Sequence, residues 1–443
     1  MQTGKLIVVG AGIAGVTAAQ VARAEYPHIE INLFSKEPLP FYNKIALNSF
    51  ITGKRNLAEM HFYPPNWLAR QRIDARWGEW IVSINPKEHV VVTNRAEKFS
   101  YDKLILATGA TPSIPPIPGA SVSRCATLWT MEDAIKVRDA LPSCKNVAII
   151  GGGVLGVETA LDLAGTGSDV TLLEAQSSLL PANLNATAAE MLGEFVQSKR
   201  VKLRLNAVGY KIERGKNGDQ FLRGNNETIP ADLVLMIAGV KPNTKLADDA
   251  EIPVDEGILV NDQMATSTLD ILACGNCTKL RGATQFLWNS AINQATIAGQ
   301  NAFDVKQTIS THVASIHLKT PQMPLFICGN HLPQNNRDIF AQSRTGNAYK
   351  SIRLDSDGHI QSAILLGDTD GFYQIEHAIN FKSKFDMTTT GQNPDRIINA
   401  LKANTKQTNN AWVCQMCGYT HEGVLPPNIC SVCAVGRDQF LAT

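Results

Sequence analysis

Two glycine-rich loops, each set between apolar runs, constrain the fold of this 443-residue chain more than any other feature. The first loop, Gly10-x-Gly12-x-x-Gly15, follows the run at residues 5–9 and precedes a small-residue stretch that leads to a second run at residues 29–34. Continuous apolar runs bounded by glycines predict buried strands, and the small-residue stretch predicts a helix between them. Strand, helix and strand in this order form the βαβ unit of a parallel sheet.

The second loop, Gly151-x-Gly153-x-x-Gly156, repeats the same setting between the runs at residues 146–150 and 170–173. Glycines at this spacing allow a tight turn, let the backbone approach a pyrophosphate and let the helix pack closely on the strand. The N-terminus of the helix adds about half a positive charge, which favours a bound phosphate. One such loop is weak evidence, whereas two copies in the same context predict two dinucleotide sites.

Acidic residues near the end of each second strand are candidates for binding ribose hydroxyl groups. Glu174 lies 23 residues after Gly151, close to the usual spacing of about 20. Its carboxylate would repel a 2′-phosphate, and Ala175-Gln176 offers no arginine to receive one, so the second site is expected to prefer NADH over NADPH. Glu37 is the corresponding residue at the first site, with a spacing of 27 residues, and a solvated surface glutamate is the alternative.

The composition argues against partners that need a strong electrostatic field. Forty-one basic and 40 acidic residues leave a formal net charge of +1, so no nucleic acid and no anionic membrane is expected as a partner. No apolar run reaches the roughly 18 to 20 residues of a membrane span. Nine cysteines, an odd count, argue against a disulfide framework and favour a reducing compartment, the cytoplasm.

Four of the cysteines form two Cys-x-x-Cys pairs near the C-terminus. Cys414 pairs with Cys417 and Cys430 with Cys433, and twelve residues separate the two pairs. Two such pairs bring four thiolates to one tetrahedral site, which suits zinc or a single iron. The spacing alone does not distinguish the two metals.

The chain resembles the flavoprotein reductases that carry two dinucleotide-binding domains, over about residues 5–400. Besides the paired loops, the resemblance rests on LILATG at 104–109, AGVKPN at 238–243 and TSTLDILACGN at 266–276. In that family the first loop binds FAD and the second binds NAD(P)H. The resemblance therefore implies cofactor contacts at Thr108, Gly109, Gly239, Gly275 and Asn276. Asn276 stands where the family has an aspartate that approaches the flavin ribityl chain, and an amide still accepts a hydrogen bond.

Two charged residues and one tryptophan gain roles from the same resemblance. Lys44, in the segment FYNK, matches a basic residue beside the flavin, and Glu158 matches an acid that faces it. Together they would form an ion pair near the nicotinamide; the alternative is two unrelated surface charges. Trp288 matches the start of a helix whose N-terminus points at the flavin ring, while a lone tryptophan is more often part of a core.

The redox cysteines of related enzymes are absent from the expected places. Residues 38–60 contain no cysteine, and Ile13 stands where related oxygen and peroxide reductases have a histidine. The flavin is therefore expected to pass electrons outward without a thiol relay. Cys274 and Cys277 form a further Cys-x-x-Cys beside the late flavin motif, and we favour two buried structural thiols over a redox dithiol.

The C-terminal residues resemble the short rubredoxin-like domain of rubrerythrins. The resemblance rests on the two cysteine pairs together with Trp412, Tyr419, His421 and Phe440. Zinc cannot accept an electron, whereas an iron tetrathiolate can. Fusion to a flavin reductase therefore favours iron, with zinc as the alternative.

The sequence thus predicts an α/β protein with two Rossmann-like three-layer dinucleotide-binding domains, an α+β C-terminal reductase domain and a small metal-bound rubredoxin-like module. The predicted boundaries are 1–113 with 245–312 for the FAD-binding domain, 114–244 for the NAD(H)-binding domain, 313–400 for the reductase C-terminal domain, 401–410 for a linker and 411–443 for the rubredoxin-like module.

The function expected from these features is that of an NADH:rubredoxin reductase. NADH would transfer a hydride to FAD, and single electrons would pass to the fused iron centre. From there they would leave to a partner redox protein of the diiron, flavodiiron or hydroxylase type. Three alternatives stay open: a reductase of a separate carrier with a zinc-bound docking tail, an NADH oxidase or peroxidase, and a nonredox NAD sensor.

Overall fold

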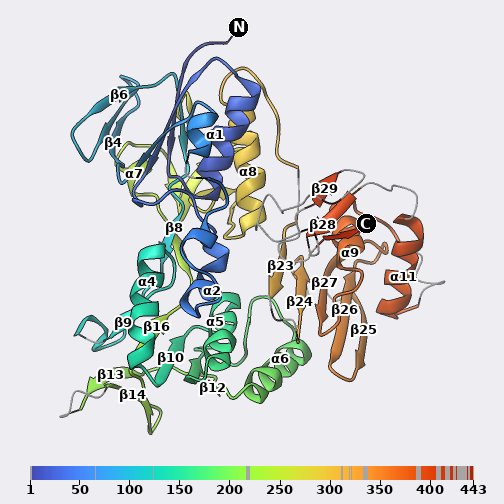
Figure 1. The fold of residues 1–443 in the computed structure, drawn as a ribbon. Coiled ribbons are helices and arrows are strands. Elements are labelled where there is room, and N and C mark those ends of the chain that lie inside the picture. The colour runs from blue at the N-terminus through green and yellow to red at the C-terminus, as the bar shows by residue number, and fades with distance from the viewer. Residues whose placement is uncertain are drawn as a thin grey trace. The chain divides into compact units, whose positions relative to one another are not determined.

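The structure is a computed structural model of the chain. It describes residues 2–405 apart from 65, 123, 216–219, 311–312, 319, 321, 333–337 and 386–390, and beyond 405 it describes residues 411–414, 420–422, 426, 437 and 440–442. The chain divides into two compact units (Figure 1). The first consists of Met1–Asn43, Leu57–Thr111 and Val240–His312, and the second of Lys44–Asn56, Pro112–Gly239 and Val313–Thr443.

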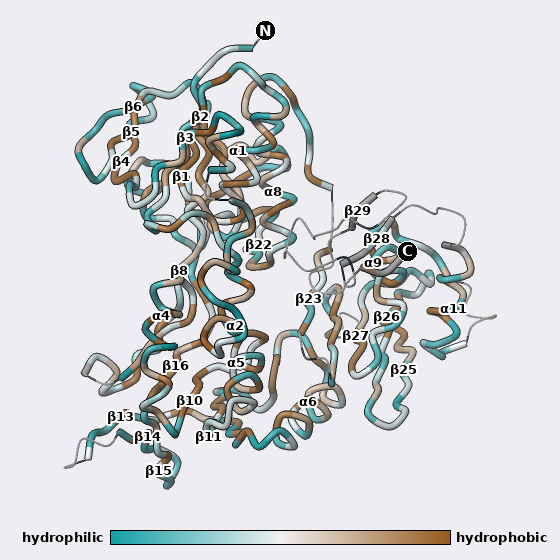
Figure 2. Tube along the Cα trace, in the orientation of Figure 1, coloured by the Kyte–Doolittle hydropathy of each residue, from teal (hydrophilic) through white to brown (hydrophobic). Residues whose placement is uncertain are grey.

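A five-stranded parallel sheet forms the centre of the first unit, in the order β20-β7-β1-β2-β3. Its strands are β1 (Lys5–Val9), β2 (Glu30–Ser35), β3 (Asp74–Trp77), β7 (Lys103–Leu106) and β20 (Ile271–Ala273). Side chains alternate along β1, so that Leu6 and Val8 enter one apolar cluster and Ile7 and Val9 another. Because both faces of the sheet are buried, its central strand β1 is apolar after Lys5, as its colour in Figure 2 shows.

Helices cover one face of this sheet, and further strands cover the other. Helices α1 (Ile13–Glu25) and α8 (Trp288–Gln300) pack against each other on the face of Leu6 and Val8. The opposite face carries β4 (Ile81–Asn85), β5 (Val90–Thr93), β6 (Lys98–Ser100) and β19 (Gly257–Val260). The shorter elements of this unit are η2 (Ala58–Met60), α3 (Trp67–Arg70), β8 (Ala110–Pro112), β17 (Val240–Pro242), α7 (Lys245–Asp248), β18 (Val254–Asp255), β21 (Thr278–Leu280) and β22 (Ala283–Thr284).

The second unit repeats this three-layer plan. Its parallel sheet has the order β12-β11-β10-β16-β9, formed by β9 (Cys125–Ala126), β10 (Asn146–Ile150), β11 (Asp169–Leu173), β12 (Lys202–Arg204) and β16 (Leu233–Met236). Helix α5 (Val154–Gly165) packs on β10 and β11. An antiparallel sheet of β13 (Lys211–Arg214), β14 (Gln220–Gly224) and β15 (Glu227–Pro230) shares an apolar cluster with Ala148 and Leu173.

The other helical elements described in this part of the unit are η1 (Lys44–Ala46), α2 (Leu47–Ile51), η3 (Ala120–Val122), α4 (Met131–Ala140), η4 (Leu141–Ser143) and α6 (Ala186–Ser198). The first two lie within the sequence range predicted for the FAD-binding domain, yet they are grouped with the second unit. The physical reason is packing, because α2 contacts both α4 and α5.

The described residues from 313 to 405 form an antiparallel sheet and two helices. The sheet order is β23-β24-β27-β26-β25, with β23 (Ser315–Leu318), β24 (Leu325–Cys328), β25 (Ile339–Thr345), β26 (Ala348–Leu354) and β27 (Ile360–Leu366). Helices α9 (Phe372–Asn380) and α11 (Pro394–Thr405) share its apolar core. Helix α11 continues into the segment predicted as a linker, because Leu401 is buried in that core and Lys402 Nζ lies 2.5 Å from Asp370 Oδ2.

The last described elements are three short antiparallel strands. They are β28 (Ala411–Cys414), β29 (Thr420–Glu422) and β30 (Phe440–Ala442), with β28 in the middle.

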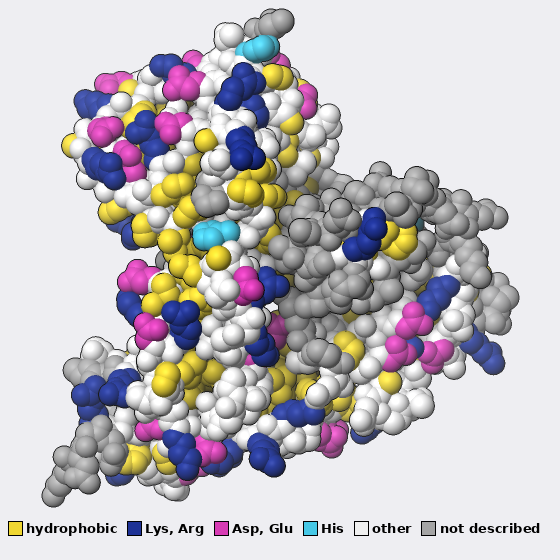
Figure 3. Space-filling model, in the orientation of Figure 1, with side chains coloured by type: hydrophobic (Ala, Val, Ile, Leu, Met, Phe, Trp, Pro, Cys, Tyr) yellow, Lys and Arg dark blue, Asp and Glu magenta, His cyan; other side chains and the backbone are white. Residues whose placement is uncertain are grey.

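The predicted α/β class is confirmed, since both glycine loops join a parallel strand to a helix as expected. Among the described residues, no helix combines the length and apolar character needed to cross a membrane. On the face that Figure 3 shows, basic and acidic side chains are interspersed rather than gathered by sign.

Candidate cofactor sites

The fold itself requires two of the three glycines in the first loop. Gly10 has φ +107°, and a Cβ there would collide with the carbonyl oxygen of Ala107. A Cβ on Gly15 would collide with the carbonyl oxygen of Gly10, where helix α1 crosses the loop. At Gly12, in contrast, φ is −73°, and among the described residues no atom beyond its own chain neighbours lies within 4 Å of the place of a Cβ. The open space in front of Gly12 is therefore not explained by packing.

The second loop has the same division of roles. Gly151 has φ +119°, and its Cβ would collide with the carbonyl oxygen of Ile237. A Cβ on Gly156 would collide with the carbonyl oxygen of Gly151, whereas Gly153 again faces open space. In each loop the unexplained glycine is the N-cap of the following helix, α1 or α5. Free backbone N–H groups and the positive end of the helix dipole make this an environment that fits a pyrophosphate.

The predicted acidic residues lie at the carboxyl ends of the second strands. Glu37 comes two residues after β2, and its Oε2 accepts a hydrogen bond of 2.5 Å from the Tyr42 hydroxyl. Glu174 directly follows β11, where Oε2 accepts from the backbone N–H of Gly152 at 2.6 Å and Oε1 from that of Gln176 at 2.8 Å. Each oxygen retains a further lone pair, so the carboxylate of Glu174 can still accept a ribose hydroxyl group.

The late flavin motif lies against the first loop. Gly275 follows β20 with φ +83°, and a Cβ there would lie 2.7 Å from the Cβ of Ala14 in α1. Its N–H donates to Oε1 of the buried Gln294 at 2.8 Å. Half-buried Asn276 comes next, so the structure brings Gly275 and Asn276 to the N-terminal end of α1, as the predicted FAD site requires.

Thr108 and Gly109 follow β7 and are tied to a segment far along the chain. The Thr108 hydroxyl donates to the carbonyl oxygen of Asn243 at 2.7 Å, and Asn243 Nδ2 donates to the carbonyl oxygen of Thr108 at 2.8 Å. Gly109 has φ +68°, and Gly239 has φ +88°. These glycines are needed for backbone conformation, and Asn243 is a structural partner that the sequence analysis did not single out.

Three aromatic rings form a wall at the start of α8. Phe41 and Phe62 stack with their centroids 5.1 Å apart, and Trp288 lies 6.5 Å from the first and 6.1 Å from the second. Trp288 Nε1 is buried without a hydrogen-bond partner in the described part of the chain. A buried orphan donor beside an aromatic wall fits a planar ligand with acceptor atoms, such as a flavin ring. No motif marked Phe62, so the sequence analysis missed it.

Lys44 and Glu158 lie on elements that the structure brings together. Lys44 begins η1, which leads into α2, and Glu158 lies in α5. Helix α2 contacts α5 directly, and Thr159 Oγ1 donates to Asn48 Oδ1 at 2.9 Å. The ion pair of Lys44 with Glu158 stays a prediction.

Cys274 and Cys277 are free, fully buried thiols. Burial raises the pKa of both, that of Cys274 well above its ordinary value, so the reactive thiolate is disfavoured. The single S–H group of Cys277 lies within hydrogen-bonding distance of two carbonyl oxygens, that of Cys274 at 3.3 Å and that of Leu106 at 3.5 Å. This environment supports the structural interpretation over a redox dithiol.

The predicted metal ligands lie mostly outside the described residues. Cys414 is the last residue of β28, the central strand of its sheet. Cys417, Cys430 and Cys433 are outside the described part. The fit of an iron therefore rests on the donor set, four soft thiolate ligands in two Cys-x-x-Cys pairs.

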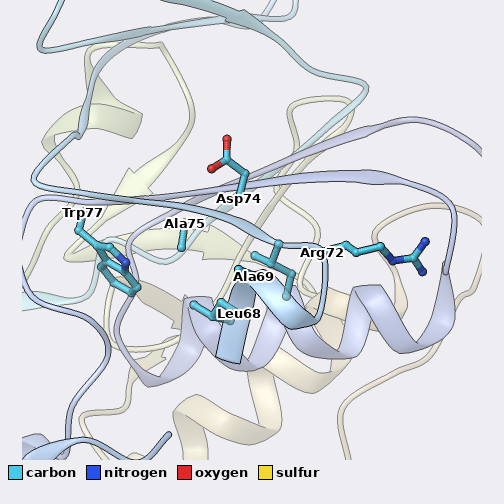
Figure 4. A pocket seen from close by; sticks show the side chains of 7 residues that line it. Leu68, Ala69, Arg72, Asp74, Ala75 and Trp77 are labelled. Carbon is cyan, nitrogen blue, oxygen red and sulfur yellow. The ribbon is translucent and has the colours of Figure 1, made fainter. Parts of the chain in front are cut away.

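A separate cavity lies between α3 and β3, with a volume of about 460 Å³. Figure 4 shows Arg72 and Asp74 at its edge with their charged ends directed away from each other, and Leu68 and Trp77 on its apolar side. Ligand sites generally have a few convergent polar groups. This cavity lacks that convergence, so we assign no ligand to it.

Comparison with known proteins gives two family matches. The model for the pyridine nucleotide-disulphide oxidoreductases matches residues 4–302, and that for the rubrerythrin rubredoxin-like domain matches residues 412–441. Both agree with the resemblances drawn from the sequence. They also confirm the predicted oxidoreductase class and the predicted cofactors FAD, NAD(H) and iron.

Among curated proteins, the assimilatory nitrate reductase electron transfer subunit of Bacillus subtilis is 30% identical over 83% of this chain, which spans only 48% of that relative. The NADH-rubredoxin oxidoreductase of Clostridium acetobutylicum is 29% identical over 90% of this chain and 100% of its own length. The rubredoxin-NAD(+) reductase of Ectopseudomonas oleovorans is 31% identical over 72% of this chain and 83% of its own.

Two solved structures are similar over nearly the whole chain. NADH:rubredoxin oxidoreductase from Clostridium acetobutylicum has a TM-score of 0.75 at 27% identity and covers 90% of this chain and 100% of its own. The covalent putidaredoxin reductase-putidaredoxin complex has a TM-score of 0.82 at 23% identity, with 91% and 99% covered, which shows the shared fold.

Proposed function

Because the chain belongs to the pyridine nucleotide-disulphide oxidoreductase family, we propose that it is an NADH-dependent flavoprotein reductase whose electrons pass to an iron centre in its own C-terminal module. The observation that carries this proposal is the fusion itself. A reductase with two dinucleotide loops is joined to a rubredoxin-like module, and a relative that matches over its whole length is named an NADH-rubredoxin oxidoreductase.

The second glycine loop would bind the pyrophosphate of NADH at the N-terminus of α5. Glu174 would accept the ribose hydroxyl groups and exclude a 2′-phosphate by charge repulsion. Its two backbone hydrogen bonds hold the carboxylate in place before the nucleotide arrives. NADH is therefore the expected electron donor.

FAD would be held by the first loop together with Glu37, Gly275, Asn276 and Trp288. When bound, it accepts two electrons as a hydride and releases them one at a time. The Lys44 amine and the Glu158 carboxylate would orient the nicotinamide beside it. The aromatic wall of Phe41, Phe62 and Trp288 would exclude water from this region. Cys414, Cys417, Cys430 and Cys433 would hold the iron, which supplies a one-electron store.

The short tether between the reductase and its C-terminal module favours electron transfer within the chain. Helix α11 ends at Thr405 and β28 begins at Ala411, so five residues join them. Fully extended, these residues span at most about 18 Å. A short tether holds a module at an effective concentration on the order of millimolar, which favours transfer within one chain.

The electrons would then leave to a soluble redox protein in the cytoplasm. Diiron peroxidases, flavodiiron oxygen or nitric oxide reductases and hydroxylases are the candidate classes. Support for a one-electron partner comes from the relatives named for rubredoxin.

Metal analysis of the purified protein tests the proposal against its main alternative. We expect one iron per chain with the visible bands of a ferric tetrathiolate, lost in Cys430→Ser while the flavin stays bound. Zinc in place of iron, with the flavin still reduced by NADH, would favour the docking-tail alternative instead.

A further inference from the structure

The segment Lys44–Asn56 leaves the first unit and returns to it, yet it packs with the second unit. It begins with Lys44 in η1 and continues through α2. Helix α2 lies against α4 and α5, so the proposed amine at the flavin is carried by a segment that is anchored on the nucleotide-binding scaffold.

Among the described residues, three of the contacts that anchor the segment differ in kind. Lys54 Nζ lies 2.6 Å from Asp162 Oδ1, but the lysine side chain is 59% exposed. Phe50 packs under the guanidinium group of Arg138, 4.2 Å from the ring centroid. The third contact is the hydrogen bond from Thr159 to Asn48.

The contact of Thr159 with Asn48 is the buried and directional one. Thr159 is 0% exposed and Asn48 is 6% exposed, and the hydrogen bond joins residues 111 apart in sequence. The Thr159 hydroxyl also lies 2.6 Å from the carbonyl oxygen of Leu155, within its own helix. An exposed ion pair contributes little and tolerates movement, whereas a buried polar pair that loses one partner leaves the other unsatisfied.

Glu158 shares a helix face with these anchors. Along α5, Leu155, Glu158, Thr159 and Asp162 follow the three- and four-residue spacing of one face. That face meets the segment through Asn48 and Lys54. Lys44 lies only four residues before Asn48 in the same segment. The way in which α2 packs on this face of α5 therefore determines where the Lys44 amine lies relative to Glu158.

We propose that Asn48 and Thr159 form a positioning pair that ties Lys44 to α5. The inference rests on the proposed function and deepens it. The N-terminus of α5 would bind the NADH pyrophosphate, and the same helix carries Glu158 and the anchor of the Lys44 segment. One rigid element thus relates the bound nucleotide to both charged groups, and Asn48 and Thr159 act through Lys44 without touching the substrate.

The test is the variant Thr159→Val, which replaces the hydroxyl group by a methyl group and keeps the shape of the side chain. A misplacement of about 1 Å at a reacting centre can lower the rate up to roughly a hundredfold, so we expect flavin reduction by NADH in a single turnover to slow about tenfold. The dissociation constant for NADH should stay unchanged, because the glycine loop is intact. Thr159→Ser, which retains the hydroxyl, should restore the rate.

A matched control exists in the first unit. Thr296 in α8 donates to the carbonyl oxygen of Ile292 at 2.9 Å, the same backbone contact within a helix. Thr296→Val therefore loses an equivalent hydroxyl and should leave the rate unchanged. FAD content and melting temperature of both variants show whether each has folded.

A second readout separates positioning from general damage. A cation beside the flavin stabilises its reduced, negatively charged form, so Lys44→Met should shift the flavin midpoint potential to more negative values. Thr159→Val should shift the flavin midpoint potential in the same direction. When it is combined with Lys44→Met, it should cause no further shift of the potential and no further slowing of flavin reduction.

The proposal would be overturned if Thr159→Val had the same effect in the wild-type protein and in Lys44→Met. It would also be overturned if Thr296→Val slowed flavin reduction as much as Thr159→Val. Failure of the proposed function would look different, because the flavin of the wild-type protein would then not be reduced by NADH at all.

Discussion

At the scale of single residues, the middle glycine of each loop differs from the two outer ones, because packing within the fold does not require it. A side chain at Gly151 or Gly156 would collide with backbone atoms of the fold, whereas the space at Gly153 is open. Gly153→Val should therefore fold and retain FAD, while NADH binds more weakly because the side chain occupies the pyrophosphate space. We expect a loss of affinity of roughly a hundredfold or more.

Equilibrium titration of the oxidised protein with NAD⁺ and of the reduced protein with NADH measures this loss. The contrasting variant is Gly156→Ala, whose Cβ would collide with the carbonyl oxygen of Gly151 and should destabilise the fold. Unchanged nucleotide affinity in Gly153→Val would refute the assignment of this loop.

Glu174 makes a second prediction at this scale, on cofactor preference. Glu174→Arg removes the charge that repels a 2′-phosphate and adds one that attracts it. Hydrogen bonds to charged groups contribute about 1.5–3 kcal/mol, so the ratio of kcat/KM for NADPH over NADH should rise roughly tenfold to hundredfold. Glu174→Gln, which removes only the repulsion, should give a smaller rise. An unchanged ratio in both variants would contradict the role given to Glu174.

Helix α9 carries a buried carboxyl group whose effect appears at the scale of the element. Glu376 is 8% exposed, and Ser315 donates to its Oε1 at 2.8 Å. Burial raises the pKa of Glu376 from 4.5 to about 7, against the smaller opposing effect of Ser315. Because the folded state binds this proton more tightly than the unfolded state, its contribution to stability is complete below about pH 4.5 and is lost as the pH rises to about 7.

Glu376→Gln should remove this dependence, since the amide can accept the same hydrogen bond and does not ionise. Relative to the variant, the wild-type protein should lose about 3 kcal/mol of stability between pH 4.5 and pH 8. Unfolding of both proteins in urea across this range measures the difference. A difference that does not change with pH would show that Glu376 has an ordinary pKa.

Elements formed by local pattern were predictable, and elements formed by distant contacts were not. The runs at residues 5–9 and 146–150 became β1 and β10 with the predicted bounds, because a strand buried on both faces is apolar throughout. Nothing in the sequence showed that residues 44–56 would pack on α5, since that depends on a contact between Asn48 and Thr159. The aromatic wall likewise needed Phe62, which no periodicity marks.

Polar composition also misled the prediction at one helix end. The linker was expected from residue 401 because the stretch is rich in Asn, Thr, Lys and Gln. Helix α11 continues to Thr405, since Leu401 completes the apolar core beneath α9. The burial of Leu401 on one face of the helix extends α11 through a stretch whose other residues are mostly polar.

At the scale of the whole molecule, the account joins three redox groups in one chain. NADH would deliver two electrons to the FAD of the first unit, and the tethered module would accept them one at a time. The central claim is that this last transfer takes place within the chain. It separates the proposed function from an oxidase, from a reductase of a separate carrier and from an NAD sensor.

An anaerobic titration with NADH, followed in the visible spectrum, tests that claim most directly on the intact chain and on a chain ending at Asn410. The flavin takes two electrons and the iron one, so full bleaching should need about 1.5 equivalents of NADH in the intact chain and about 1 in the truncated one. The flavin and iron bands of the intact chain should bleach together. Bleaching of the flavin with the iron bands left oxidised would contradict internal electron transfer.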